Sequence, residues 1–161
     1  ATVVSIATAN IFLLLIAVFS AYLVYTGWRL AKVKDGVKSI LDLRLSLLML
    51  VVSVAMIAYG IFMLTQGESL GVALIVFGFL GGAPALSDYK SPGVWPKGKH
   101  RILLHLNRMG GACIATVTAV FVVNIQTNPA FIAWLLPTLI GTPLIIYWSR
   151  RTINGKAVKT P

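Results

Sequence analysis

Three residue types are scarce in this sequence, and each scarcity limits the chemistry that the chain can carry. The 161 residues include 4 acidic side chains, 2 histidines and 1 cysteine. Because Cys113 is alone and lies in an apolar run, a disulfide framework and a CxxC redox pair are excluded. The spacing of the acidic residues indicates no metal site and no acid–base pair.

Catalytic and cofactor-binding motifs are also missing. The sequence contains no P-loop, nucleophile elbow, HExxH or dinucleotide-binding fingerprint, so it indicates no catalytic residue and no enzymatic activity. His100 and His105 lie about 140° apart around a helix, so they cannot hold one haem from opposite sides. A haem would need His105 with a methionine such as Met49 or Met109, or His105 shared across a dimer axis. We therefore predict no cofactor, with haem and quinone as the alternatives.

Long apolar runs are what the sequence has in abundance. Its composition is 58% hydrophobic and its mean hydropathy is +0.88. Runs of about 20 apolar residues match the thickness of a bilayer, and the alternating pattern of a membrane β-barrel is not found. We therefore expect a single all-α domain over residues 1–161, with five transmembrane helices at about 3–27, 45–65, 70–86, 102–123 and 130–148.

The basic residues predict how this bundle is threaded. All 14 Lys and Arg fall in or beside the first connection, the third connection and the C-terminal tail, which five crossings place on one side. Because cytoplasmic loops retain Lys and Arg, we expect the N-terminus outside and the C-terminus in the cytoplasm. Topology thus explains the net charge of +10, and nucleic acid is not an expected partner.

The ends of the runs carry further signals. The first run lacks a basic region before it, so we interpret it as a retained helix rather than a signal peptide. The start at Ala1 implies trimming or an incomplete start. We expect the third run to end at Pro84. In the last run Pro137 and Pro143 remove backbone donors, and Thr138 and Thr142 are expected to satisfy the freed carbonyls.

The densest polar cluster lies at the start of the fourth run. Arg101, His105 and Arg108 are spaced four and three apart and so share one helix face. With Asn107 and Trp95 nearby, this face could hold an anionic lipid headgroup, a phosphate or a quinone carbonyl. The alternative is an ordinary interfacial anchor whose small-residue continuation packs against a neighbouring helix, through Ala112, Ala115 and Ala119.

Two other groups have structural interpretations. Asp42 and Asp88 are expected to form ion pairs with Arg44, Arg108 or a nearby Lys. Gly78 and Gly82 are in GxxxG register, and Gly110 and Gly111 form a second small-residue surface. Such glycines favour close helix packing within the bundle first and oligomerisation second.

The segment from His105 to Ala112, continued from Ala115 to Asn124, resembles part of a family of small multi-pass bacterial membrane proteins of unknown function. The segment Trp134–Thr138 with Gly141–Pro143 resembles the same family. The resemblance covers mainly residues 105–143. It implies a bacterial inner-membrane location and contributes no catalytic residue.

Three functions are compatible with these observations. The first is a structural or accessory component that works through helix packing, either with itself as a homo-oligomer or as a subunit of a larger membrane complex. The second is a quinone-, haem- or lipid-binding redox module at the cytoplasmic side, using His105 and Arg108. The third is a small transporter that uses the Pro137 and Pro143 breaks. In each case the lipid bilayer is the surrounding partner.

Overall fold

The computed structural model describes residues 11–32, 36–91, 93–125 and 127–153. Within these ranges the regular elements are helices, with one isolated β-bridge between Val37 and Val94, which confirms the predicted all-α class. The five described helices are α2 (Ile11–Lys32), α3 (Ile40–Thr65), α4 (Gly71–Lys90), α5 (Lys99–Asn124) and α6 (Phe131–Ile153). The predicted first span begins at residue 3, so its residues 3–10 lie outside the described ranges.

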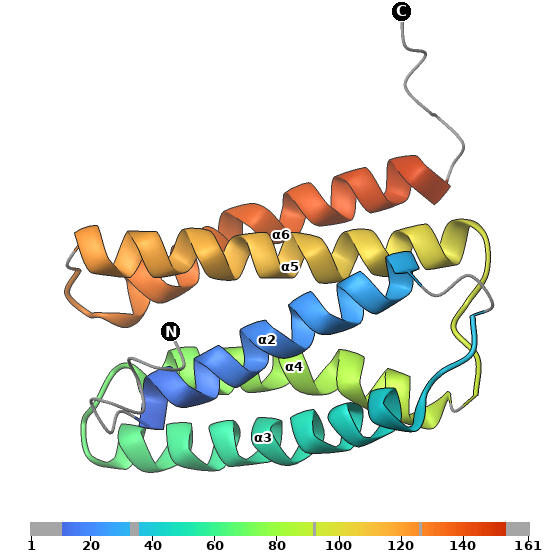
Figure 1. Cartoon of the computed structure of the whole chain (residues 1–161). Coiled ribbons are helices and arrows are strands. Elements are labelled where there is room, and N and C mark those ends of the chain that lie inside the picture. The colour runs from blue at the N-terminus through green and yellow to red at the C-terminus, as the bar shows by residue number, and fades with distance from the viewer. Residues whose placement is uncertain (1–10, 33–35, 92, 126, 154–161) are drawn as a thin grey trace, which may run out of the picture.

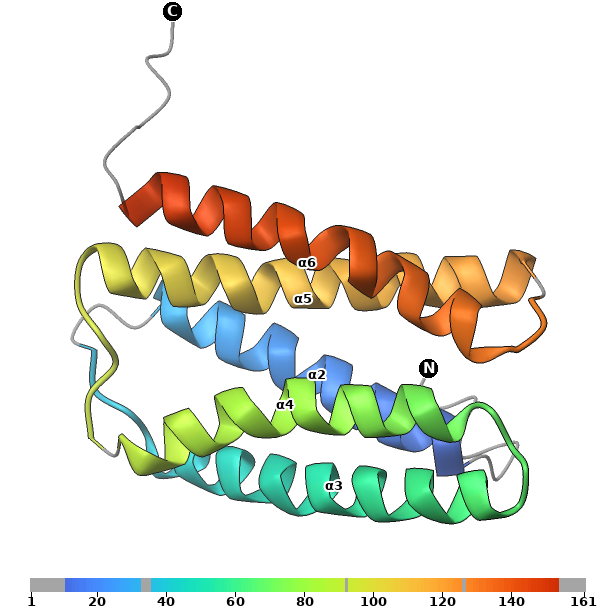
Figure 2. The ribbon, with the colours of Figure 1, turned by 180° about the vertical axis from the view of Figure 1, so that it is seen from behind.

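The helices form two antiparallel hairpins with α2 between them (Figure 1). The α3–α4 hairpin turns through Gly67, whose φ of 80° suits glycine, and the α5–α6 hairpin lies on the other side of α2. Seen from behind, α4 and α5 face each other across α2 (Figure 2). The basic ends of α2, α4 and α6 all lie at one end of the bundle (Figure 1).

Four of the described helices, α2, α3, α4 and α6, are long and apolar enough to cross a membrane, which is typical of a multi-pass membrane protein. Helix α5 is not among them, although its 26 residues equal the length of α3. The first three turns of α5 contain Lys99, Arg101 and Arg108, which lower its hydropathy. The fifth crossing therefore stays a prediction.

Helix α4 continues past Pro84 to Lys90, so the prediction that this run ends at Pro84 is wrong. Proline removes one backbone donor but permits a helix to continue when packing holds the following turns. Here Ala85 is fully buried, and the Asp88 side chain is bound by Tyr22 and Arg108. The tertiary contacts of these turns therefore outweigh the local signal.

Glycines bring the hairpin helices together. A Cβ added to Gly60 would lie 2.7 Å from the carbonyl oxygen of Gly71, so α3 and α4 cross at backbone contact. Gly78 and Gly82 continue this contact, both against Ser53 of α3. The predicted GxxxG pair thus packs inside the bundle.

The second small-residue surface lies between α5 and its neighbours. Gly110 receives the Ile145 side chain of α6, and Gly111 receives Leu23 of α2. Ala112 is buried, whereas Ala115 is partly exposed and Ala119 is exposed. Of the three alanines predicted to pack against a neighbouring helix, only Ala112 is therefore buried within the chain.

Candidate functional site

A buried ion pair joins α4 to α5 near the basic end of the bundle. Arg108 Nη2 donates to Asp88 Oδ2 at 2.7 Å and to the Pro84 carbonyl oxygen at 3.3 Å. The two side chains are 4% and 6% exposed. Desolvating both charges costs several kcal/mol per ion unless hydrogen bonds compensate. The contribution of this pair to the stability of the fold therefore depends on the hydrogen bonds around it.

Two groups from other elements support the carboxylate side of the pair. Tyr22 of α2 donates its hydroxyl to the same Asp88 Oδ2 at 2.7 Å. Lys38, in the connection between α2 and α3, donates to the main-chain oxygens of Asp88 and Ser91, both at 2.8 Å. Partial burial lowers the pKa of Lys38. Asp88 thus ties together α2, α4, α5 and the first connection.

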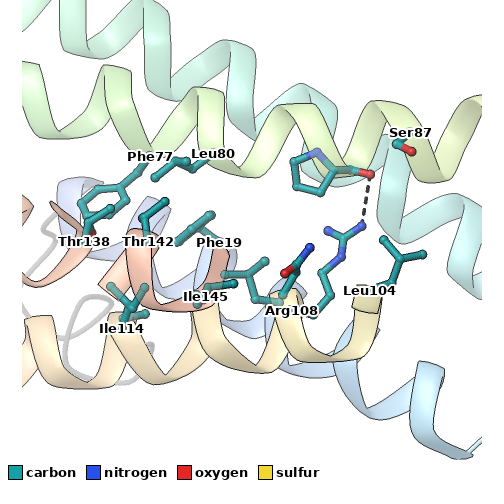
Figure 3. Close-up of a pocket in the computed structure, with 15 residues that line it drawn as sticks. Phe19, Phe77, Leu80, Ser87, Leu104, Arg108, Ile114, Thr138, Thr142 and Ile145 are labelled. Atoms are coloured by element: carbon teal, nitrogen blue, oxygen red, sulfur yellow. Dashed lines mark hydrogen bonds between the residues drawn. The ribbon is translucent and has the colours of Figure 1, made fainter. Parts of the chain in front are cut away.

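An apolar cleft of about 300 Å³ lies beside Arg108, between α4, α5, α6 and the inner face of α2 (Figure 3). Arg108 and Ser87 stand at one end of the cleft, and Phe77 and Thr138 stand at the other. The remaining walls are almost entirely hydrocarbon, from Phe19, Leu23, Leu80, Pro84, Leu104, Gly111, Ile114, Ala115 and Ile145, with Asn107 and Thr142 as polar additions.

Two polar atoms of the cleft lining are buried without hydrogen-bond partners among the described residues. They are Nη1 of Arg108 and Oγ1 of Thr138. Arg108 as a whole is only 3% exposed. The prediction that Thr138 satisfies a carbonyl freed by proline is therefore wrong, and its hydroxyl is buried beside the cleft. A buried donor without an acceptor costs about 1–3 kcal/mol, so an acceptor placed beside these atoms would recover that cost.

The cleft continues as a second cavity of about 580 Å³ between α4 and α6. The two cavities share Leu80, Thr138 and Thr142. The second is lined by hydrocarbon from Val76, Phe131, Leu135 and Leu139, among others, and Leu139 is 72% exposed at its rim. Together they form a groove with one polar end and a long apolar extension, which we call the α4–α6 cleft.

The three residues of the predicted polar face, Arg101, His105 and Arg108, have two different kinds of contact in the structure. Arg101 Nε and His105 Nδ1 bind the carbonyl oxygens of Leu30 and Gly27, and the His105 contact is 2.8 Å. Leu30 lies in the last turn of α2, whose carbonyls lack intrahelical donors, so Arg101 caps this helix. Gly27 lies further from the helix end, so the His105 contact joins α5 to the side of α2. Only Arg108 of the three lines the cleft, and ligand binding by Arg101 and His105 stays a prediction.

The other two predicted ligand-binding residues, Asn107 and Trp95, lie in different surroundings. Asn107 lines the cleft and accepts a hydrogen bond from Ser149 of α6 at 2.8 Å. Trp95 is 2% exposed and lines neither cavity, so the structure does not bring it to the cleft. Its backbone pairs with Gly36, and its ring receives the Lys38 ammonium at 4.3 Å. The α2–α3 and α4–α5 connections thus bind each other and enclose Trp95.

Asp42 pairs with Arg29 and not with Arg44. Arg29 donates Nε and Nη2 to the two carboxylate oxygens at 3.0 and 2.8 Å, a two-bond geometry that arginine favours. Asp42 also accepts from the Ser39 backbone, which completes a capping box at the start of α3. Arg44 is exposed, because two residues along a helix turn its side chain away from the Asp42 face.

The residues considered as haem ligands have other contacts in the described part of the chain, and the absence of a cofactor stays a prediction. His105 is engaged with Gly27, and Met49 lies in the core beside Phe19 and Gly81. Met109 packs its sulfur against Gly27 on the same helix as His105. The described ranges contain no group of three or more His, Cys, Asp or Glu side chains that could hold a metal ion.

No protein-family model, curated protein or solved structure matches this chain. The resemblance over residues 105–143 and the bacterial origin that it implies therefore stay predictions.

Proposed function

We propose that this chain is an integral membrane protein that holds a lipid-soluble, amphipathic molecule in the α4–α6 cleft. The observation that carries the proposal is Arg108 Nη1, a buried donor at the polar end of an apolar groove, which has no hydrogen-bond partner among the described residues. An amphiphile fits both parts, because its head accepts from Arg108 and its chain follows the hydrocarbon walls toward Leu139.

A pair of matched substitutions on α5 tests this proposal. Ala115 lines the cleft, whereas Ala119, one turn further on, is exposed. Ala115→Phe fills the cleft, and Ala119→Phe adds the same bulk outside it. We expect lipid-soluble adducts in native mass spectra of the wild type and of Ala119→Phe, and their loss in Ala115→Phe. Equal adduct levels in all three proteins would contradict the proposal.

The membrane topology that we propose has five crossings, with the N-terminus outside and the C-terminus in the cytoplasm of a bacterial inner membrane. The support is that α4 ends at the basic end of the bundle and α6 begins at the opposite end (Figure 1). Helix α5 runs beside α6 along this length and so has the reach to cross with it (Figure 1). The one-sided distribution of Lys and Arg sets the direction.

An accessory role is the second candidate. Its support is helix α6, where only 11% of the most apolar stretch is buried within the chain. The outward side chains Ile140, Leu144 and Tyr147 are available to a second copy or to another subunit as well as to lipid. Co-purification with one partner at fixed stoichiometry supports this role, and a monomer at all protein concentrations argues against it.

A further inference from the structure

We infer that the α4–α6 cleft selects amphiphiles whose head is an uncharged carbonyl, as in a quinone ring or an acyl ester, over those with an anionic head. This inference rests on the proposed function and adds the chemical class of the ligand. It follows from the charge of the buried pair, from the donor that the pair leaves open, and from the depth of that donor.

The charge of Arg108 is already neutralised within the site. Asp88 accepts from Nη2 at 2.7 Å, so the pair presents a dipole to the cleft and not a net positive charge. An anionic head beside Nη1 would add a second negative charge near the Asp88 carboxylate in a medium of low dielectric. Like charges at such distances repel strongly when water is excluded.

Lys38 is the other cation near the pair, and it faces away from the cleft. Its ammonium binds the Asp88 and Ser91 main-chain oxygens and lies over the Trp95 ring. It lines neither of the two cavities. The cleft therefore has one charged donor, Arg108, and that donor is paired.

A neutral acceptor satisfies the open donor without this repulsion. A carbonyl oxygen accepts from Nη1, and the hydroxyl of Thr138, further along the cleft, is a second donor for a head with two carbonyls. Hydrogen bonds to a charged donor are among the stronger ones in proteins. The cleft thus offers what a quinone or an ester can use.

The depth of Arg108 favours the same class. It is the tenth residue of α5, so it lies about 14 Å along the helix from Lys99. A charged headgroup prefers the water interface, and holding it at this depth costs hydration energy. A carbonyl head loses little water and can lie at that level.

A series of compounds with one tail and different heads tests the inference on the full-length wild type. The probes are methyl palmitate, palmitate and hexadecane, with a decyl-substituted benzoquinone as the second carbonyl source. Binding to the immobilised protein is measured by scintillation proximity at equal mole fractions in the micelle. We expect methyl palmitate, the quinone or both to bind about ten- to a hundredfold more tightly than palmitate and hexadecane.

The outcomes separate the inference from the proposal beneath it. Tightest binding of palmitate, or equal binding of all the probes, overturns the carbonyl preference and leaves an amphiphile-binding cleft. No binding of any probe removes the proposed function as well. Binding of the quinone alone, or of the ester alone, supports the inference and identifies the source of the carbonyl.

A double variant checks the residue that carries the preference. Arg108→Gln alone leaves Asp88 charged and buried, so it can fail to fold. Asp88→Asn with Arg108→Gln keeps the site neutral and removes the charged donor. In this protein we expect methyl palmitate to bind no more tightly than hexadecane. An unchanged preference in the double variant would overturn the role of Arg108.

Discussion

Arg108 and Asp88 meet at 2.7 Å between α5 and α4, and the same carboxylate oxygen also receives the hydroxyl of Tyr22. Three helices therefore converge on one atom. Such a buried pair stabilises the fold only while both partners are present, because a single remaining charge is not compensated. This relationship connects the packing of the bundle to the cleft beside it.

The first prediction concerns the removal of one partner. Asp88→Asn leaves the Arg108 charge buried, and we expect the free energy of unfolding to fall by about 3–5 kcal/mol. Adding Arg108→Gln should recover most of this loss, because the site is then neutral. Unfolding in detergent, followed for the wild type, both single variants and the double variant, measures the coupling. If the loss of unfolding free energy in the double variant equals the sum of the losses in the two single variants, the predicted coupling is wrong.

A second prediction tests the crossing of α3 and α4. Gly71 packs against the Gly60 carbonyl, which is backbone and cannot move aside, whereas Gly82 meets only the Ser53 side chain at 3.2 Å. Alanine is about 1 kcal/mol better than glycine in a helix, so Gly82→Ala should be neutral or stabilising. Gly71→Ala should lose about 1–3 kcal/mol through overpacking. Thermal melting of the two variants compares them directly, and equal effects would show that the crossing is loose.

A third prediction follows from the pKa of Lys38, which burial lowers in the folded protein. Between this lowered pKa and the ordinary lysine value of about 10.4, the unfolded chain binds more protons than the folded chain. Stability from this residue therefore rises with pH in that alkaline window. The free energy of unfolding of the wild type, minus that of Lys38→Met, should increase toward pH 10.4. A flat or falling difference would contradict the burial of the ammonium.

A fourth prediction concerns topology. In a Cys113→Ser background, cysteines at Ser91, Lys97 and Arg150 should react with a membrane-impermeant reagent only after the cytoplasmic side is opened. A cysteine at Glu68 should react in intact cells, because the α3–α4 turn lies at the opposite end of the bundle. Labelling of Lys97→Cys and Glu68→Cys from the same side would overturn the threading.

The sequence predicted the parts of the fold that depend on long-range averages. Apolar length and the distribution of Lys and Arg indicated the helices and their basic ends, since both signals extend over many residues. Helix ends were less accurate. At Pro84 a local breaker signal was outweighed by the contacts of Ala85 and Asp88, which come from other helices.

The site was predictable only in part. Asp88 and Arg108 could be proposed as partners because both lie at inner ends of adjacent runs. Arg29 was missed as the partner of Asp42, although its position in the last turn of α2 was a usable signal. Tyr22 and Lys38 had no distinguishing pattern, and the proline next to Thr138 predicted a different role for its hydroxyl. Their roles depend on the angle of α2 and the spacing of α4 and α6, which no local spacing encodes.

The contacts between α5 and α2 show what the spacing of the basic cluster could not predict. Arg101 and His105 are spaced as an anion-binding face would be, yet both bind carbonyls of Gly27 and Leu30. A one-dimensional pattern shows which side chains share a face, but it does not show which helix end lies opposite. The orientation of α2 against α5 had to be known first.

The exposed rim of the α4–α6 cleft at Leu139 bears on how a ligand enters the cleft. If the cleft holds the proposed amphiphile within a bilayer, that molecule reaches the opening by diffusing within the leaflet and not from the aqueous phase. Occupancy then follows the guest's share of the surrounding lipid, so that growth conditions that remodel the bilayer alter loading even when the amount of protein is constant.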